Sequence, residues 1–397
     1  MKKILYGTTA LLAAGMISTA ANAAEPLKLQ LGGYMNWYVA AAENDDGYRK
    51  ALSNNVAGDG DFNQFDVMGD SEVYFTGSTL LDNGMKVSAH IELETGTANN
   101  GTRAADETYL TVDSAYGRVI AGATRNVASK MHVSAPEVGV LDVEESDVVD
   151  LVTAPGNITA LDATWLNTDG KLNKISYVSP TYYGVTLGAT WTPGADDTTR
   201  GTNLSENSML QDGTFKEGYA LNAMYAGSFV GVDVTTTAAF GSYNVGGKSA
   251  QDEYSLGLNV AYAGFTLGGG YREVSDNNDA TGWNGANRAV GTTSVDGYAW
   301  NVGGSYEAGP YGVSLNYFKS EVEGDRAASA ADLANAGQDE FEAYMLSGKY
   351  NLGAGVDSFA TIARVEYTDE DNTVTGAAKD ILNNEGWAFA TGIALSF

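Results

Sequence analysis

Apolar and polar residues alternate with a period of two along most of this chain, which is the pattern of β-strands with one apolar face. The run 27–39 shows it clearly. Its odd positions carry Leu, Gly, Met, Trp and Val, and its even positions carry Lys, Gln, Gly, Tyr and Asn. The same alternation recurs down to Phe397, and it predicts about sixteen strands.

The predicted strands are joined alternately by tight turns and by long polar loops. The turns include Asn83-Gly84, a strong hairpin signal, and Gly227-Ser228, whereas residues 194–217 and 276–294 form long loops. After the first run, the predicted strands are 73–81, 85–94, 108–112, 118–124, 173–180, 185–193, 219–226, 229–243, 252–263, 265–274, 295–307, 311–321, 341–352, 356–369 and 386–397. Short turns at one end and long loops at the other are typical of an outer-membrane barrel rather than of a Greek-key sandwich.

The two faces of the predicted strands fit such a barrel. One face is apolar, with Trp and Tyr near the strand ends, as in the aromatic belts at membrane interfaces. The other face carries Gly, Ser, Thr, Asn and scattered charges. A barrel of about sixteen strands is wide enough to enclose water. We therefore predict an all-β fold, a transmembrane antiparallel β-barrel with lipid against its apolar face and water inside.

One long interval, from Arg125 to Gly170, lacks the alternation and carries a group of acids. Loops of this length are uncommon and usually functional. The acids are Glu137, Asp142, Glu144, Glu145, Asp147 and Asp150. We predict that this third external loop folds into the barrel as a constriction, where carboxylates favour cations over anions. The alternative is a solvated loop, or one that binds divalent cations between lipopolysaccharide phosphates.

The first residues predict export. Lys2 and Lys3 precede an apolar run, and Ala21-Asn22-Ala23 has the small-x-small pattern of a cleavage site. Residues 1–23 are therefore predicted to be a signal peptide and residues 24–397 a single barrel domain; an uncleaved anchor is the alternative. Loss of the two lysines changes the net charge from −28 to −30, which argues against nucleic acid as a partner.

Little in the sequence supports enzyme or metal chemistry. The chain has no cysteine, and its two histidines, His90 and His132, lack metal-ligand spacing. No G-x-S-x-G motif marks a hydrolase nucleophile. We predict no enzyme activity and no cofactor beyond divalent cations held loosely at acidic loops, and we place His90 on the pore wall. A barrel that serves as a hydrolase or an anchor remains a lesser alternative.

Five stretches resemble the Gram-negative general porin family: residues 107–117, 118–125, 174–180, 184–190 and the terminal Leu395-Ser396-Phe397. The resemblance implies a homotrimer in the outer membrane of a Gram-negative bacterium, in contact with lipid and lipopolysaccharide. It implies passive diffusion of small hydrophilic solutes past an inward third loop that faces basic residues. It also implies that Phe397 is read by the barrel-assembly machinery.

Candidate pore-wall bases follow from the resemblance and from strand parity. Arg125 stands where the family often has a pore arginine. The alternation of the strands places six further candidate bases on the polar, lumen-facing side: Lys28, Lys86, Arg118, Arg272, Lys349 and Arg364. The chain departs from the family in lacking a tight arginine ladder. Tyr34, Tyr38 and Tyr74 on the polar face leave open a second function, a solute-selective channel for a ligand such as a sugar.

Overall fold

The computed structural model describes residues 26–55, 63–94, 105–145, 149–155, 158, 160–194, 215–245, 250–276, 296–323, 338–369, 380 and 382–397. The predicted signal peptide and Asp147 lie outside these residues. Within them, no helix has the length and apolar character needed to cross a membrane.

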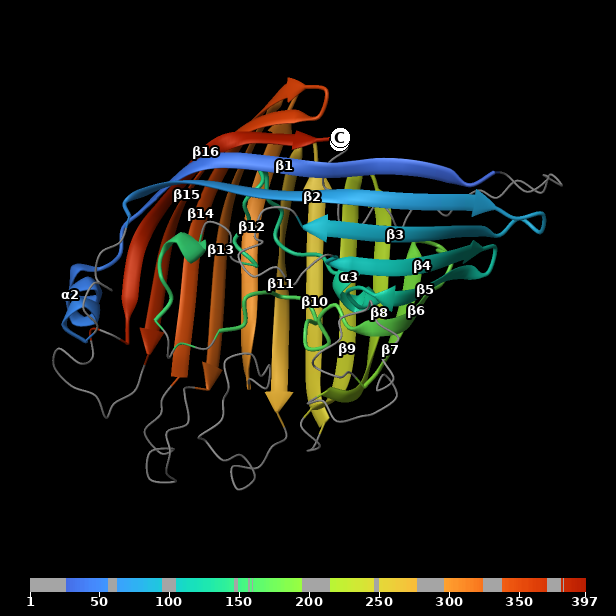
Figure 1. Ribbon diagram of the computed structural model, residues 1–397, viewed down its shortest axis with the longest axis horizontal. Coiled ribbons are helices and arrows are strands. Elements are labelled where there is room, and N and C mark those ends of the chain that lie inside the picture. Colours follow the sequence, from blue (N-terminus) through green and yellow to red (C-terminus); the bar gives the residue numbers. More distant parts are fainter. Residues whose placement is uncertain are drawn as a thin grey trace.

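Sixteen antiparallel strands close into a barrel in which each strand pairs with its sequence neighbours (Figure 1). The strands are β1 Lys28–Ala42, β2 Phe65–Leu80, β3 Lys86–Glu94, β4 Glu107–Ser114, β5 Gly117–Ala123, β6 Asn173–Val178, β7 Val185–Pro193, β8 Phe215–Phe229, β9 Val232–Val245, β10 Ala250–Tyr262, β11 Phe265–Asp276, β12 Gly297–Ala308, β13 Tyr311–Glu323, β14 Gln338–Gly353, β15 Val356–Asp369 and β16 Asn384–Ser396. Two helices, α2 Asp46–Asn55 and α3 Val127–Lys130, and a short 3-10 turn, η1 Val149–Leu151, lie between them. The predicted all-β sixteen-stranded barrel is thus confirmed.

The first and last strands complete the barrel. β1 pairs with β16 from Tyr34↔Ser396 to Ala42↔Ala388. Beyond this ladder, the Gly33 amide donates to the Phe397 carbonyl at 3.0 Å, and the Phe397 amide donates back to the Gly33 carbonyl at 3.1 Å. With this closure every strand has a paired neighbour on each side, as the absence of water in hydrocarbon requires.

The outer face is apolar over the middle of the strands, as the alternation predicts. Leu29, Trp37, Leu256 and Leu267 are more than half exposed on the isolated chain. The orientation that strand alternation predicted is wrong at one position. Arg364 lies on the outer face of β15, beside Trp387, with its guanidinium carbon 6.0 Å from the Trp387 ring centroid. The prediction that it faces the lumen is wrong, because β15 buries the alternate positions Ala363 and Val365 instead.

Four tight turns share one backbone conformation, in which a non-glycine residue in the left-handed region is followed by Gly. Tyr183, Val230, Ala263 and Ala354 have φ between 47° and 52°. This pair of left-handed residues is the type I′ turn, whose twist matches a hairpin. The turn predicted at Gly227-Ser228 is therefore wrong by three residues, because the strand continues to Phe229 and reverses at Val230-Gly231.

The first external connection holds more structure than predicted. Residues 43–66 were expected to form a polar loop, but helix α2 forms within it, and β2 already begins at Phe65. The Asp45 carboxylate accepts hydrogen bonds from the amides of Gly47 and Tyr48, which caps the first turn of α2.

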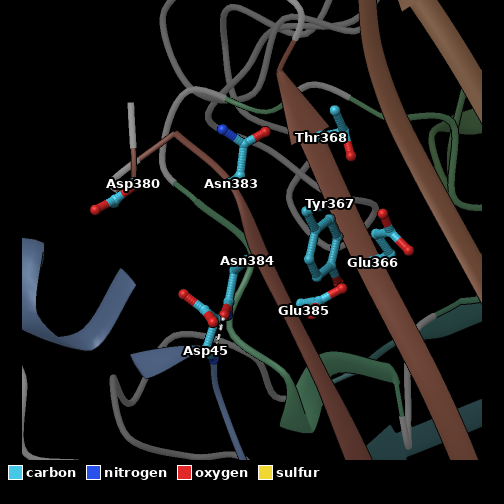
Figure 2. Close-up of a pocket in the computed structure, with 8 residues that line it drawn as sticks. All are labelled: Asp45, Glu366, Tyr367, Thr368, Asp380, Asn383, Asn384 and Glu385. Atoms are coloured by element: carbon cyan, nitrogen blue, oxygen red, sulfur yellow. Dashed lines mark hydrogen bonds between the residues drawn. The ribbon is translucent and has the colours of Figure 1, made fainter. Parts of the chain in front are cut away.

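The external rim near α2 is held by amide side chains around a small cavity (Figure 2). The Asp45 amide donates to the Asn384 side-chain oxygen at 3.0 Å. Asn384 in turn donates to the Asn44 side chain at 2.6 Å and to the Thr153 carbonyl at 2.7 Å. These bonds join the first loop, the third loop and β16 at one point.

Strand length differs around the barrel. β3, β4, β5 and β6 have nine, eight, seven and six residues, whereas β8 to β16 have twelve to sixteen. A strand needs about 9–11 residues to cross the hydrocarbon of a bilayer. Figure 1 shows β1 to β5 running nearly at right angles to β10 to β14.

Candidate functional site

Residues 124–172, which we call the inner loop, connect β5 to β6 and make their contacts with the inner wall. Helix α3 starts the loop, with the Asn126 side chain capping the Ser129 amide at 2.8 Å. Val127 and Met131 pack with Ile120 and Val178 from the inner faces of β5 and β6. The loop therefore turns inward directly after the strand ends.

Side chains of the inner wall hold the backbone of the inner loop along its course. The Ala135 amide donates to Asn301 Oδ1 of β12 at 3.1 Å. On β13, Ser314 Oγ accepts from the Val138 amide at 3.1 Å, and Ser320 Oγ accepts from the Leu161 amide at 2.8 Å. These inward Asn and Ser residues replace water as partners for buried backbone groups of the loop.

An apolar cluster fills the space between the inner loop and β11 to β16. Val143, Val149 and Val152 of the loop are fully buried in it. The strands contribute large inward side chains such as Phe318 and Phe341, and between them the alanines Ala299, Ala343, Ala363, Ala388 and Ala390. Small side chains let a second layer of backbone lie against the wall, so this part of the interior is a packed core.

Glycines allow the closest approaches of the loop to the wall. A Cβ built on Gly257 of β10 would lie 1.9 Å from the Val133 carbonyl oxygen, and one on Gly270 of β11 would lie 2.4 Å from Thr164 Oγ1. No real side chain can occupy these positions without moving the loop. Together with the alanines, they show that β10 to β16 are built to carry the loop.

The base of the inner loop is fixed by a buried ion pair. Lys174 Nζ of β6 lies 3.4 Å from Asp169 Oδ2, and both side chains are almost fully buried. Lys174 also donates to the carbonyls of Thr124 and Gly170, at 2.5 and 2.7 Å. The Thr192 hydroxyl donates to Asp169 at 2.8 Å. Each charge thus has several hydrogen bonds, which burial of charge requires.

Glu144 forms a buried cluster inside the loop. It accepts hydrogen bonds from Ser134 Oγ at 2.6 Å, from the Thr164 amide at 2.9 Å and from Thr164 Oγ1 at 2.5 Å. His132 Nε2 lies 3.0 Å from the same Thr164 hydroxyl. Burial raises the pKa of Glu144 to about 7 and lowers the pKa of His132 to about 3. Glu144 is therefore a structural group that does not face the lumen.

Glu145 is the predicted acid best placed to meet solutes. Its side chain is 35% exposed, it forms an ion pair with Arg125, and its backbone has a φ of 53°. The Glu145 amide donates to the Asp162 carbonyl at 3.0 Å, which brings an exposed acid that was not predicted beside it. The Arg125 guanidinium also lies 5.5 Å from the Trp165 ring centroid.

The remaining predicted acids have varied surroundings. Glu137 accepts from the Val143 amide at 3.2 Å and thus braces the loop. Asp142 is partly buried and Asp150, in η1, is exposed. Asp162 lies between the buried residues Leu161 and Ala163, and three residues are too short a pattern to identify it from the sequence.

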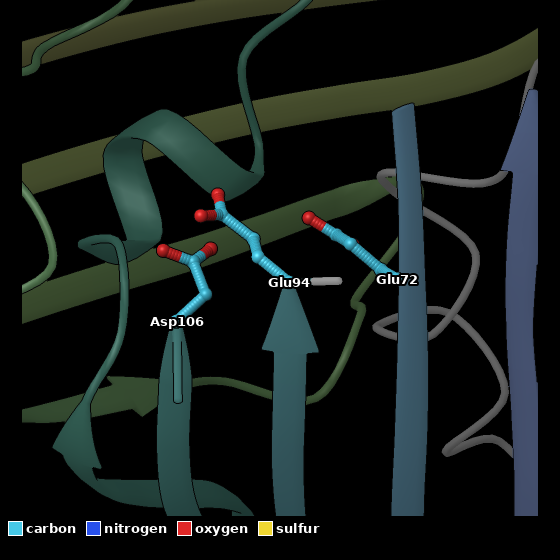
Figure 3. A group of neighbouring side chains, drawn as sticks. All are labelled: Glu72, Glu94 and Asp106. Atoms are coloured by element: carbon cyan, nitrogen blue, oxygen red, sulfur yellow. The ribbon is translucent and has the colours of Figure 1, made fainter. Parts of the chain in front are cut away.

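The inner wall of β1 to β4 differs from the loop-covered wall, because large polar side chains line it. Sequence reasoning missed its acids as a group: Asp70, Glu72, Glu92, Glu94, the last residue of β3, and Asp106, directly before β4. Glu72, Glu94 and Asp106 project toward one another, with one carboxylate oxygen of each within 4.8 Å of the others (Figure 3). Such carboxylate oxygens suit hard divalent cations. Lys171 forms an ion pair with Asp106, and Lys130 with Glu107.

The predicted pore-wall bases fall into three groups. Lys28, Lys86 and Arg118 lie near the turn end of the inner wall, where Arg118 forms an ion pair with Asp113. Lys349 also lies near that end, 2.7 Å from Glu307. Arg272 is buried against Glu253 at 3.1 Å. Of the predicted bases, Arg125 pairs with a predicted acid of the inner loop, whereas Arg272 lies beneath the loop against Glu253, which also accepts from the Asn167 amide.

These features define the class of protein. A closed barrel of sixteen strands with an apolar outer face and a polar interior is an outer-membrane channel. The family model described as Gram-negative porin matches residues 7–370, and the chain belongs to this family. It is a channel protein of the outer membrane and not an enzyme.

Solved structures of porins share the fold. A porin refined at 1.8 Å resolution is 15% identical and covers 93% of this chain and 100% of its own, with a TM-score of 0.57. The outer membrane channel DcaP of Acinetobacter baumannii is 13% identical, with coverages of 94% and 97% and a TM-score of 0.58. OmpT of Vibrio cholerae in its trimer form is 10% identical, with coverages of 95% and 100% and a TM-score of 0.54. A comparison with curated protein sequences finds no match.

Proposed function

We propose that this porin lets small hydrophilic solutes and ions diffuse passively across the outer membrane, with a preference for cations. The observation that carries the proposal is the acidic character of both sides of the lumen. On the inner loop Asp150 and Asp162 are exposed and Glu145 is partly exposed, and the inner wall of β1 to β4 carries Glu72 and Glu92. A narrow passage between carboxylates concentrates cations and excludes anions.

Basic residues near the inner loop reduce the negative electrostatic potential of the lumen but do not reverse its sign. Arg125 lies beside Glu145, and Lys130 lies beside Glu107, so each offsets one acid. Lys171 likewise pairs with Asp106, and Arg272 is buried against Glu253. Lys28, Lys86, Arg118 and Lys349 lie near the turn end, away from the inner loop. Coulomb interactions across water fall off within about 10 Å at ordinary ionic strength, so charges at the level of the loop decide selectivity.

Reversal potentials across a planar bilayer test the proposal. Under a KCl gradient, the purified porin should show a potential of the sign given by excess K⁺ permeation. The double variant Glu72→Gln/Glu92→Gln should lower the preference, because it removes two carboxylates from the wall. A chloride preference of the unmodified porin at neutral pH would refute the proposal.

We also propose a homotrimer in which neighbouring copies cover the short strands. β4 to β6 are too short to cross hydrocarbon alone, yet they carry exposed apolar residues, including Leu110, Val119 and Ile175. Light scattering on the detergent complex should give the mass of three chains. Leu110→Trp should shift the mass toward one chain, whereas Leu256→Trp on β10 should leave it at three. A monomeric unmodified porin would exclude this arrangement.

Two further contacts belong to the same proposal. We propose that the exposed Phe397 side chain, next to the barrel closure, serves as the signal for the assembly machinery. Charged residues at the outer external rim, such as Lys319 between Glu340 and Glu342, are proposed to meet lipopolysaccharide head groups. Phe397→Ala should lower the amount of folded porin in outer-membrane fractions, while refolding in detergent should proceed.

A further inference from the structure

Four aromatic rings form a row on the inner wall of β1 to β4. Tyr34, Tyr74, His90 and Tyr109 come from four successive strands, and all lie on inward positions. Their ring centroids are 6.3, 5.8 and 4.9 Å apart in that order. Tyr38 does not join the row, because it is buried against Phe359. The row spans three strand spacings, or roughly 14 Å.

Carboxylates hold the polar ends of these rings. The Tyr34 hydroxyl donates to Asp70 Oδ2 at 2.7 Å, and the Tyr74 hydroxyl donates to Glu72 Oε2 at 2.6 Å. His90 Nε2 lies 3.5 Å from Glu92 Oε2. The phenol protons are thus directed at protein carboxylates rather than at the lumen. The row therefore places aromatic rings directly beside negatively charged groups.

A cation of the protein itself already occupies one end of the row. Lys130 Nζ lies 4.9 Å from the centroid of the Tyr109 ring and 2.9 Å from Glu107 Oε2. An ammonium group therefore fits between a ring face and a carboxylate of this wall. The neighbouring positions repeat the same chemistry, with Tyr74 beside Glu72 and Tyr34 beside Asp70.

We propose that this row is a binding site for organic cations that carry ammonium groups, and that diamines bind it better than monoamines. This inference rests on the channel proposed above and narrows its solute. Cation–π attraction and a carboxylate act together on each ammonium group, and a second ammonium can reach the next ring along the row. Sugars are the competing ligand class, since aromatic rings also stack on sugar faces.

Block of single-channel current by putrescine tests the proposal. Putrescine added to the porin in dilute KCl should reduce the K⁺ current in a saturable way, and propylamine should do so only at higher concentration. Tyr74→Leu should weaken the putrescine block about tenfold, because it removes the central ring face. Tyr74→Phe keeps the ring and should keep the block. Tyr109→Leu, at the other end of the row, is a second variant in case Tyr74→Leu does not fold.

A matched variant separates this site from the general cation preference. Glu145→Gln should lower the K⁺ over Cl⁻ preference and leave the putrescine block unchanged, whereas Tyr74→Leu should do the reverse. A block that Tyr74→Leu and Tyr109→Leu both leave intact would overturn the binding site while the selective channel stands. Saturable block by maltotriose that depends on Tyr74, without block by putrescine, would also overturn it and identify a sugar site.

Discussion

The two halves of the inner wall use the same strand alternation for opposite purposes. On β10 to β16, the inner loop packs as a second layer onto inward alanines, onto apolar rings such as Phe318 and Phe341, and onto Ser and Asn side chains. On β1 to β4, the inward residues are Tyr, His, Asp and Glu, and they face the lumen. The difference teaches that inward parity alone does not define a pore-lining residue. The apolar cluster beneath the inner loop distinguishes the wall that supports the loop from the polar wall that meets solutes.

Removing the ion pair that holds the base of the inner loop on the wall should have the largest effect on stability. Lys174→Met leaves Asp169 buried without its cation, which we expect to lower the free energy of unfolding by about 3–5 kcal/mol. Urea unfolding in detergent micelles measures it. Lys174→Met/Asp169→Asn should recover part of the loss. Arg49→Met, at an exposed ion pair with Asp46, should change it by less than about 1 kcal/mol.

The buried cluster around Glu144 should make the stability of the protein depend on pH. The pKa of Glu144 is raised from 4.5 to about 7, so the folded state binds the proton more tightly. Its stabilising contribution is complete below about pH 4.5 and is lost as the pH rises through about 7. The full difference is on the order of 3 kcal/mol. Unfolding midpoints across this range should decline less for Glu144→Gln than for Asp162→Asn; equal declines would contradict the assignment.

A larger side chain on the wall beneath the inner loop should displace the loop, with a smaller loss in the free energy of unfolding. Gly257→Ala places a methyl group against the Val133 carbonyl, and we expect a cost of about 1–3 kcal/mol in the free energy of unfolding. The single-channel current should also become noisier, because the displaced loop borders the lumen. Gly348→Ala has open space and should change neither quantity. An unchanged current for Gly257→Ala would mean that the loop does not set the passage.

Changing one exposed acid should have the smallest effect. Glu145→Gln removes one negative charge from the loop side of the lumen, and we expect the K⁺ over Cl⁻ permeability ratio to fall about threefold. Glu145→Asp keeps the charge and should keep the ratio. If both variants behave alike, the β1 to β4 wall alone determines the preference.

The sequence predicts the barrel well because alternation reports which face of a strand is apolar. It identifies sixteen strands and the outer faces, and its error at Gly227-Ser228 arises because Gly also fits inside a strand. Arg364 shows a physical limit. Outward positions near the external rim meet polar head groups, so charge there does not indicate the lumen.

The candidate site was predictable only in part. Composition located the acids of the loop, yet it could not separate the exposed Glu145 from the adjacent buried Glu144, because that depends on the Ser134 and Thr164 hydroxyls. The row of rings joins four strands at contacts set by strand register, which no local pattern encodes. Asp147 lies outside the described residues and stays a prediction.

The alanines and glycines beneath the inner loop have a consequence for how this channel can be closed or widened. If the loop moved out of the barrel, the apolar surface of the wall beneath it would be exposed to water. The buried valines of the loop would also become exposed. Such a movement is unfavourable, so the loop acts as permanent lining and not as a hinged gate. Engineering a wider passage would require replacing those small apolar residues with hydrophilic ones at the same time as shortening the loop.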